Sequence, residues 1–83
     1  MNKQSQNKYF STSDLGCAAA LISAGFDLIS LNKDNPRKVL FIFKEKSGIE
    51  DTVNNYFSGK LKISAINLFN NTKMLKNRIY ISM

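Results

Sequence analysis

The sequence lacks histidine and tryptophan and has one cysteine, Cys17, among its 83 residues. Without histidine, the side chain that most often acts as general base in enzymes is missing. The usual zinc sites cannot be built within one such chain either. A single cysteine forms no internal disulfide, which is typical of a reducing compartment. We therefore predict a protein that is not an enzyme, with no metal, no cofactor and no small-molecule substrate.

Long apolar runs are also missing. A membrane-spanning helix needs about 20 consecutive apolar residues, and no run in the sequence approaches that length. The polar start MNKQSQNK lacks the apolar segment of a signal peptide. We expect a cytoplasmic protein with no membrane partner, a flexible polar arm at residues 1–8 and one small domain at residues 9–83.

Acidic residues are absent after Asp51. Residues 1–59 contain seven basic and six acidic residues, whereas residues 60–83 contain five basic and no acidic residues. Almost all of the net charge of +6 therefore lies in the last 24 residues. Asparagine, lysine and isoleucine are all abundant, a mixture that AT-rich coding sequence also produces. The charge can thus reflect either a partner or composition.

The centre of the sequence, residues 26–44, has the pattern of two strands joined by a polar turn. Residues 39–43 are β-branched, aromatic or leucine, which favours a strand. Asparagine, aspartate and proline within residues 32–37 favour a chain reversal. Alternation predicts two faces on the second strand, with Val39, Phe41 and Phe43 on one and Leu40 and Ile42 on the other.

The first strand of this hairpin has apolar residues on both faces as well. Alternation predicts Leu28 on one face and Ile29 and Leu31 on the opposite one. A hairpin with two apolar faces is not stable when left bare in water. We therefore expect both faces to be covered, by helices of the same chain or by a second copy.

Three helices are predicted around the hairpin. The first runs from about residue 14 to 24, between the cap residues Thr12, Ser13 and Asp14 and the stop at Gly25. It has no charge after Asp14, so it is either a buried core helix or a subunit interface formed along its small residues.

The second helix is predicted to begin at a capping box of Ser47 and Glu50 and to end at Gly59. Its apolar stripe consists of Ile49, Val53, Tyr56 and Phe57. Residues 60–63 alternate basic and apolar side chains, which predicts an extended connector with Leu61 and Ile63 directed inward.

The third helix is predicted to begin after a cap at Ser64. Helical spacing gives an apolar stripe of Ala65, Leu68, Phe69, Thr72, Leu75 and Ile79. The opposite, polar face then holds Asn67, Asn70, Asn71, Met74, Asn77 and Arg78. On a helical wheel with 100° per residue, Lys73 falls at the margin of the polar face and Lys76 inside the apolar stripe.

The predicted fold is α+β, in the order helix-strand-strand-helix-helix, with an antiparallel hairpin packed against three short helices.

Four segments carry a family resemblance: the opening TSDLGCAAALISAGF, the strand VLFIFK, the segment VNNYFSGKLKISA and the final NTKMLKNRIY. Together they extend over about residues 9–81. They resemble a family of small domains of unknown function found in microbial and mobile-element genomes. The resemblance implies a shared fold, and it implies no catalytic or binding residue.

Two functions are compatible with these features. The first is accessory nucleic-acid binding, in which lysine and arginine neutralise phosphate and asparagine contacts base edges. The candidate residues are Lys60, Lys62, Lys73, Lys76 and Arg78, with a second patch in the hairpin loop at Lys33, Arg37 and Lys38. The order of the last two helices is similar to a helix-turn-helix, although residues 59–64 make a longer link than that motif uses.

The second function is a homodimer or protein-partner module that uses the apolar hairpin and the uncharged first helix. What separates the two functions is whether the basic side chains converge on one surface in the folded chain, because scattered lysines are ordinary solubilising groups.

Overall fold

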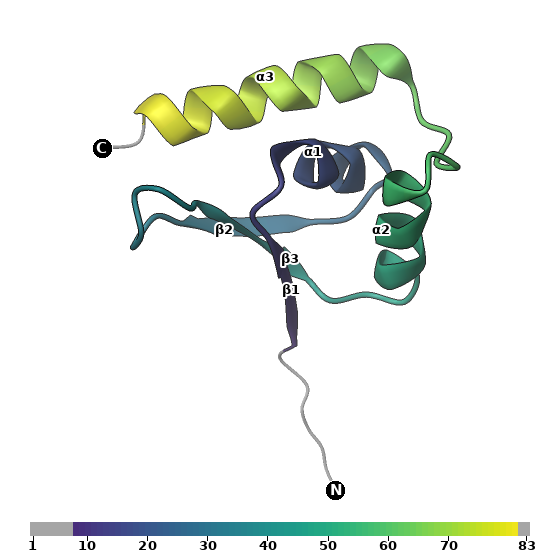
Figure 1. Ribbon diagram of the computed structural model, residues 1–83, viewed down its shortest axis with the longest axis horizontal. Helices are drawn as coiled ribbons and strands as arrows, with labels where there is room; N and C mark the ends of the chain where they lie inside the picture. Colours follow the sequence, from purple (N-terminus) through teal and green to yellow (C-terminus); the bar gives the residue numbers. More distant parts are fainter. Residues whose placement is uncertain (1–7, 82–83) are drawn as a thin grey trace, which may run out of the picture.

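The computed structural model describes residues 8–81 and has an α+β fold (Figure 1). Its elements are β1 (Tyr9–Thr12), α1 (Leu15–Ser23), β2 (Leu28–Asn32), β3 (Leu40–Lys44), α2 (Ile49–Phe57) and α3 (Ala65–Ile81). The predicted class is confirmed, and the predicted order is found from α1 onward. β1 was not counted in that order, and α3 is not short, with 17 residues. Most of the predicted polar arm lies outside the described residues.

β1 completes a three-stranded antiparallel sheet in the order β1-β3-β2. Phe10 pairs with Phe43, and Thr12 pairs with Phe41. Four residues are too few to establish a period of two in the sequence, and two of them are serine and threonine. The strand forms because β3 offers a free edge for backbone hydrogen bonds. α1 crosses over between β1 and β2, which run parallel on either side of β3.

β3 provides the centre of the core. Phe41 and Phe43 are fully buried, and Val39 packs against the same cluster. The prediction that these three side chains share one face is confirmed. Because a buried phenylalanine is among the largest contributors to a small core, β3 holds the sheet to the helices.

β2 departs from simple alternation. Its register shifts between Leu28 and Ser30, so that Leu28 pairs with Phe43 and Leu31 pairs with Phe41. Paired residues share a face, and both leucines therefore pack against the core, whereas Ile29 is 50% exposed. The prediction that Leu31 lies opposite Leu28 is wrong, because the irregularity inserts one residue into the alternation.

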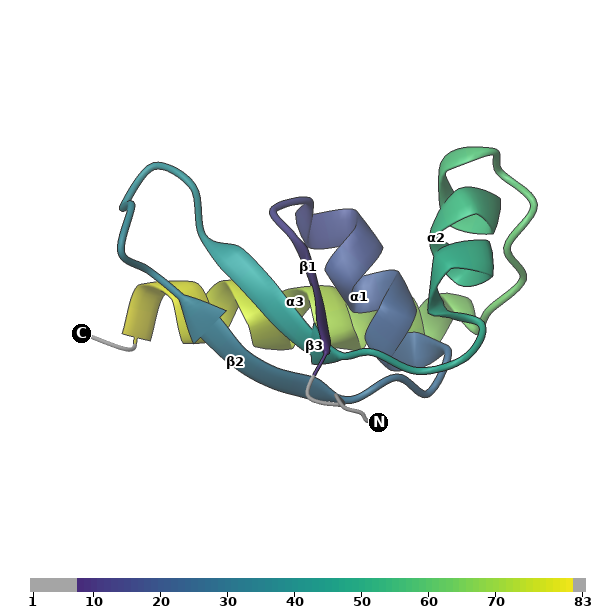
Figure 2. The ribbon, with the colours of Figure 1, turned by 90° about the horizontal axis from the view of Figure 1, so that it is seen from below.

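The second face of the sheet is left open by the helices (Figure 2). Ile42 lies there between Ser11 and Ser30, and Leu40 pairs with Asn32. Ile42 and Leu40 are half-buried by these neighbours. Within residues 8–81 no helix covers this face, so the expectation that helices of the same chain cover both faces is wrong, because polar partners allow an antiparallel sheet to keep one solvated face. Cover by a second copy stays a prediction.

α1 is buried on nearly all sides and lies between the sheet and the other two helices. Five consecutive residues, Cys17 to Leu21, are fully buried. The Asp14 carboxylate accepts a hydrogen bond of 2.7 Å from the Cys17 amide and caps the helix, and Gly25 follows with φ of 100°. The core-helix interpretation is confirmed. Gly16 has no side chain, and any Cβ there would overlap the Tyr56 hydroxyl.

α2 begins differently from the prediction. Its N-cap is Gly48, with φ of 94°, and no side chain caps the helix. The predicted capping box of Ser47 and Glu50 is therefore wrong. The left-handed turn at Gly48 replaces it, because only glycine adopts that conformation readily. Phe57 is 61% exposed and does not belong to the buried stripe, whereas Ile49, Val53 and Tyr56 pack against the core.

α3 begins at the predicted cap. The Ser64 hydroxyl accepts a hydrogen bond of 3.2 Å from the Asn67 amide. The helix lies across α1 and reaches the tip of the β2–β3 hairpin (Figure 1). Leu75 is its fully buried residue, and Leu68 and Ile79 pack against the core beside it. α2 and α3 each pack chiefly on α1, and residues 58–64 form a longer link between them than the turn of a helix-turn-helix.

Candidate nucleic-acid interface

The orientation of α3 decides which side chains face solvent. Asn71 points inward, where its side-chain amide donates a hydrogen bond of 2.9 Å to the Ser23 hydroxyl of α1. Phe69 points outward and is 58% exposed. The predicted placement of Phe69 in the apolar stripe and of Asn71 on the polar face is thus wrong. The buried side of α3 is therefore turned toward Asn71 and away from Phe69, relative to the predicted stripe.

This rotation brings two lysines onto the outward face. Lys73 and Lys76 are both exposed, so the predicted position of Lys76 inside the apolar stripe is wrong. Phe69, Lys73, Lys76 and Tyr80 follow one another at helical spacings of four, three and four residues. With about 3.6 residues per turn, such spacings keep side chains on one side of a helix. We call these four residues the α3 stripe.

Both aromatic side chains of the α3 stripe reach far into solvent. Tyr80 is 76% exposed, and the Lys73 Nζ atom lies 5.3 Å from the centre of the Phe69 ring. The exposed amides of Asn70 and Asn77 lie beside the stripe. Since no acidic residue follows Asp51, no carboxylate of α3 neutralises this face.

Lys60 and Lys62 lie in the connector that precedes α3, and both are exposed. Leu61 and Ile63 between and after them are half-buried. The predicted alternation of this connector is therefore confirmed. The two lysines precede the N-terminal end of α3 in the chain.

The hairpin loop lies at the other end of α3. The Lys33 Nζ donates hydrogen bonds of 2.8 Å to the Arg78 carbonyl and 3.1 Å to the Ile79 carbonyl. Carbonyls near a helix C-terminus carry partial negative charge, so a lysine stabilises them. Arg37 and Lys38 border a depression of about 430 Å³ that Ile79 also lines. The basic loop residues Lys33, Arg37 and Lys38 thus come close to the C-terminal half of α3. This proximity cannot be read from the sequence, in which the two segments lie far apart.

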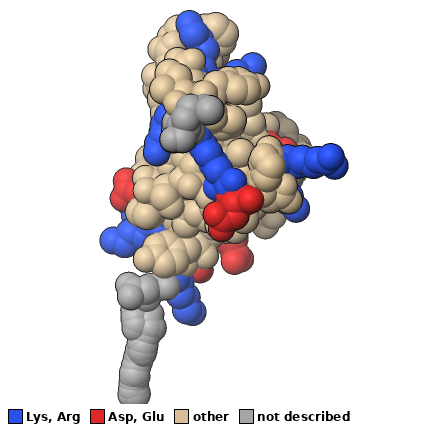
Figure 3. Space-filling view, turned by 90° about the vertical axis from the view of Figure 1, so that its left-hand side faces the viewer, with Lys and Arg blue, Asp and Glu red and all other residues tan. Residues whose placement is uncertain are grey.

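The basic side chains do not form one continuous patch. Figure 3, seen from the side where the hairpin tip and the end of α3 lie, shows acidic groups beside basic ones in its middle and lower parts. The upper part of this view, which α3 occupies, shows basic groups without acidic ones. In this view the surface of α3 is therefore the part that has basic and no acidic side chains.

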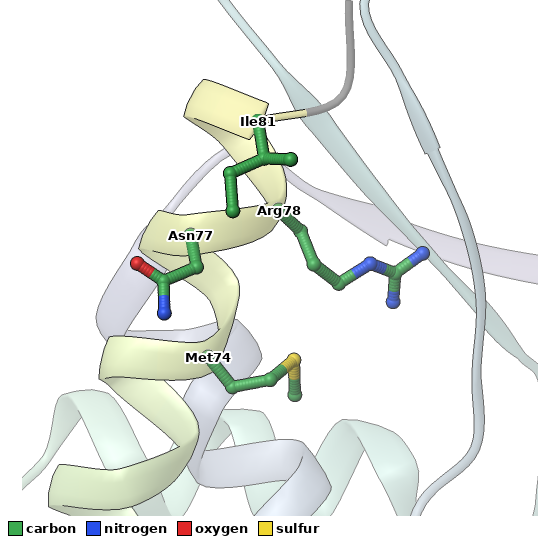
Figure 4. Close-up of a pocket in the computed structure, with 4 residues that line it drawn as sticks. All are labelled: Met74, Asn77, Arg78 and Ile81. Atoms are coloured by element: carbon green, nitrogen blue, oxygen red, sulfur yellow. The ribbon is translucent and has the colours of Figure 1, made fainter.

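A second depression lies on α3 next to the stripe (Figure 4). Its volume is about 340 Å³, and it is lined by Met74, Asn77, Arg78 and Ile81. Met74 and Ile81 lie one above the other along the helix, and Asn77 and Arg78 extend to either side. The depression thus combines an apolar floor with an amide and a guanidinium group at its borders.

The cysteine is placed for packing. Burial raises the pKa of the Cys17 thiol; a hydrogen bond with Thr12 opposes this shift, and the Asp14 carboxylate adds to it. A thiol with a raised pKa is a poor nucleophile at neutral pH. Burial, followed by the charge of Asp14, also raises the pKa of Tyr56.

Among residues 8–81 there is no cluster of three metal-ligating side chains and no helix long and apolar enough to cross a membrane.

Comparison with known proteins gives a family for the chain. Residues 7–81 match a family described as Domain of unknown function (DUF5659). The chain belongs to this family. No curated protein and no solved structure matches it. Membership extends over nearly all of the chain and assigns no activity, so function has to be argued from the surface of α3.

Proposed function

We propose that this DUF5659 domain binds nucleic acid through the outward face of α3. The observation that carries the proposal is the α3 stripe, in which two lysines lie between two exposed aromatic rings on a helix without acidic residues. Lysines attract phosphate, and aromatic rings stack on bases. The rotation of α3 supports the proposal, because a helix that buried Lys76 would offer a mainly neutral surface.

The candidate cations do not all converge on one surface, so the proposal rests on those of α3, and the remaining ones have a subordinate role. Lys60 and Lys62 precede α3 and lengthen the contact with phosphate, and Arg37 and Lys38 provide a second contact beyond its other end. Lys33 holds the loop against α3 through the Arg78 carbonyl. We expect these residues to add affinity that does not depend on base sequence.

The test measures binding of a labelled oligonucleotide across a salt series, after nuclease treatment of the protein. Lys73→Glu with Lys76→Glu should reduce affinity at low salt by at least about tenfold and lower the salt slope by about two. The matched control is Lys44→Glu with Lys46→Glu, two exposed lysines outside α3, which should change affinity by less than about threefold. Equal losses in both variants would indicate a nonspecific effect of net charge and contradict the α3 site.

The connector is tested separately. Lys60→Glu with Lys62→Glu should weaken binding to every sequence alike and flatten the salt dependence. Unchanged affinity would remove these two lysines from the site while leaving the α3 stripe in place.

Self-association is the second candidate, and the open sheet face supports it. Tyr9 is 57% exposed and Ile29 is 50% exposed on the strands that border this sheet. Two copies could pair along these edges, since an edge strand retains unpaired backbone groups. α1 makes no contribution here, because its small residues are buried. A dimer at tens of micromolar protein that Tyr9→Lys with Ile29→Lys abolishes would support this function, and a monomeric mass would contradict it.

A further inference from the structure

The shape of the α3 surface indicates which form of nucleic acid fits it. We propose that the domain prefers a single strand over a duplex, with bases stacked on Phe69 and Tyr80 and one base seated in the Met74–Ile81 depression. This inference rests on the proposed function and specifies its ligand. Three features of α3 carry it: the exposure of the rings, the position of the lysines and the form of the depression.

The two aromatic rings are accessible and held apart on a rigid element. Phe69 and Tyr80 are separated by eleven residues, which is about 16 Å along a helix. In a single strand each base offers a free face on which such a ring can stack. In a duplex those faces are covered by neighbouring base pairs, and a helix in the groove meets base edges and phosphates. Large exposed rings therefore favour unpaired bases.

The two lysines lie where the backbone between stacked bases would pass. Lys73 and Lys76 come between Phe69 and Tyr80 in the stripe. Lys73 already approaches the Phe69 ring, with its Nζ atom 5.3 Å from the ring centre. Because this ammonium lies over one face of the ring, it can contact a phosphate while a base stacks on the opposite face. The order ring, cation, cation and ring suits a strand whose phosphates pass between two stacked bases.

The depression offers a seat for a base turned away from the stripe (Figure 4). A base is flat, with apolar faces and a polar edge. One apolar face can lie on the floor formed by Met74 and Ile81. The Asn77 side chain, at one border, can donate to and accept from that edge. The Arg78 guanidinium, at the other, can bind the attached phosphate.

An anionic membrane is a less suitable partner for this face. A helix that lies in a lipid interface gathers its apolar residues on one side and keeps polar groups on the other. Here Lys73 and Lys76 lie between the exposed rings, and Asn70 and Asn77 lie next to them. Insertion of the rings would carry these polar groups into the apolar layer.

The first experiment compares a labelled single strand with the duplex of the same sequence by fluorescence anisotropy at one fixed salt concentration. We expect the single strand to bind at least about tenfold more tightly. Equal binding, or tighter binding of the duplex, would overturn this inference and leave the proposed function standing. Binding of neither, with or without uptake by phosphatidylserine vesicles, would overturn both.

The second experiment uses variants matched in exposure. Phe69→Leu with Tyr80→Leu keeps apolar bulk and removes the rings, and should reduce single-strand affinity by about five- to a hundredfold. Duplex affinity should change by less than about twofold. The control is Phe57→Leu, an equally exposed ring on α2, with an expected change below about twofold. Unchanged single-strand affinity in the double variant would overturn the stacking role.

The depression is tested by Asn77→Ala, with the exposed Asn54 of α2 replaced by alanine as the control. Loss of a hydrogen bond to a base edge should lower single-strand affinity by about threefold or more. Asn54→Ala should leave the affinity unchanged. Equal single-strand affinity of the Asn77→Ala variant and the unaltered protein would contradict the proposal that a base binds in the depression.

Discussion

α1 and α3 are both helices, but α1 is buried in the interior and α3 lies on the surface of the domain. α1 has nine residues, and five consecutive residues in it are fully buried. α3 is almost twice as long but has one fully buried residue, Leu75. The small residues of α1 let the sheet, α2 and α3 approach it from several sides, whereas α3 covers the domain with one side only. In this fold the interior helix holds the domain together, and the outer helix offers a surface to a partner.

The largest effect should come from removing a large side chain of α1. Leu21→Ala is expected to lower the free energy of unfolding by about 2–5 kcal/mol, because it leaves a cavity in the core. Ile66→Ala on the exposed side of α3 should change it by less than about 0.5 kcal/mol. Urea unfolding followed by circular dichroism measures both. Similar losses in the two variants would contradict the division between an interior and an outer helix.

The contact between the two helices can be weakened directly. The Asn71 amide donates to the Ser23 hydroxyl at 2.9 Å. Asn71→Ala should cost about 0.5–1.5 kcal/mol of unfolding free energy. In a double-mutant cycle with Ser23→Ala the two losses should not add, because each variant removes the same hydrogen bond. Additive losses would show that this hydrogen bond does not orient α3.

The smallest effect concerns the thiol inside α1, and it should be absent at neutral pH. Burial raises the pKa of Cys17 in the folded chain, whereas in the unfolded chain the thiol ionises near its ordinary pKa of about 8.5. The unfolded state therefore loses its proton first, and stability should fall as pH rises above that value. The slope cannot exceed about 1.4 kcal/mol per pH unit.

Unfolding midpoints between about pH 7 and 10 measure this fall. Cys17→Ala serves as the control, because it keeps the tyrosines and lysines that also ionise in this range. The part of the decline that disappears in Cys17→Ala belongs to the thiol. An identical pH dependence in both proteins would mean that the Cys17 pKa is not raised by folding.

Much of the fold was predictable, because local chemistry is consistent along the chain. A cap among Thr12, Ser13 and Asp14, the Ser64 cap and the inward side of β3 all followed from side-chain type and spacing, and the structure selects Asp14 from the three. β1 was missed because four residues contain too little pattern. The inward position of Leu31 was missed because a sheet irregularity has no signature in alternation.

The residue types of the candidate site could be predicted from the sequence, but the side of α3 on which they lie could not. Lys73 and Lys76 stand out as basic residues in an acid-free segment, whereas neither aromatic ring of the α3 stripe was a predicted site residue. Which side of α3 they occupy could not be read from a helical wheel, since an asparagine and a phenylalanine exchanged their expected places. The only available signal was the spacing of Phe69, Lys73, Lys76 and Tyr80.

The sequence by itself determined the α+β class, the ends of α1 and the start of α3, because capping, glycine turns and apolar spacing act over a few residues. Tertiary structure alone decided the rotation of α3 and the approach of the hairpin loop to its C-terminal end. Both depend on contacts between residues more than forty positions apart, the bonds of Asn71 to Ser23 and of Lys33 to the Arg78 carbonyl. A local pattern cannot encode such contacts, because their geometry exists only once the helices pack.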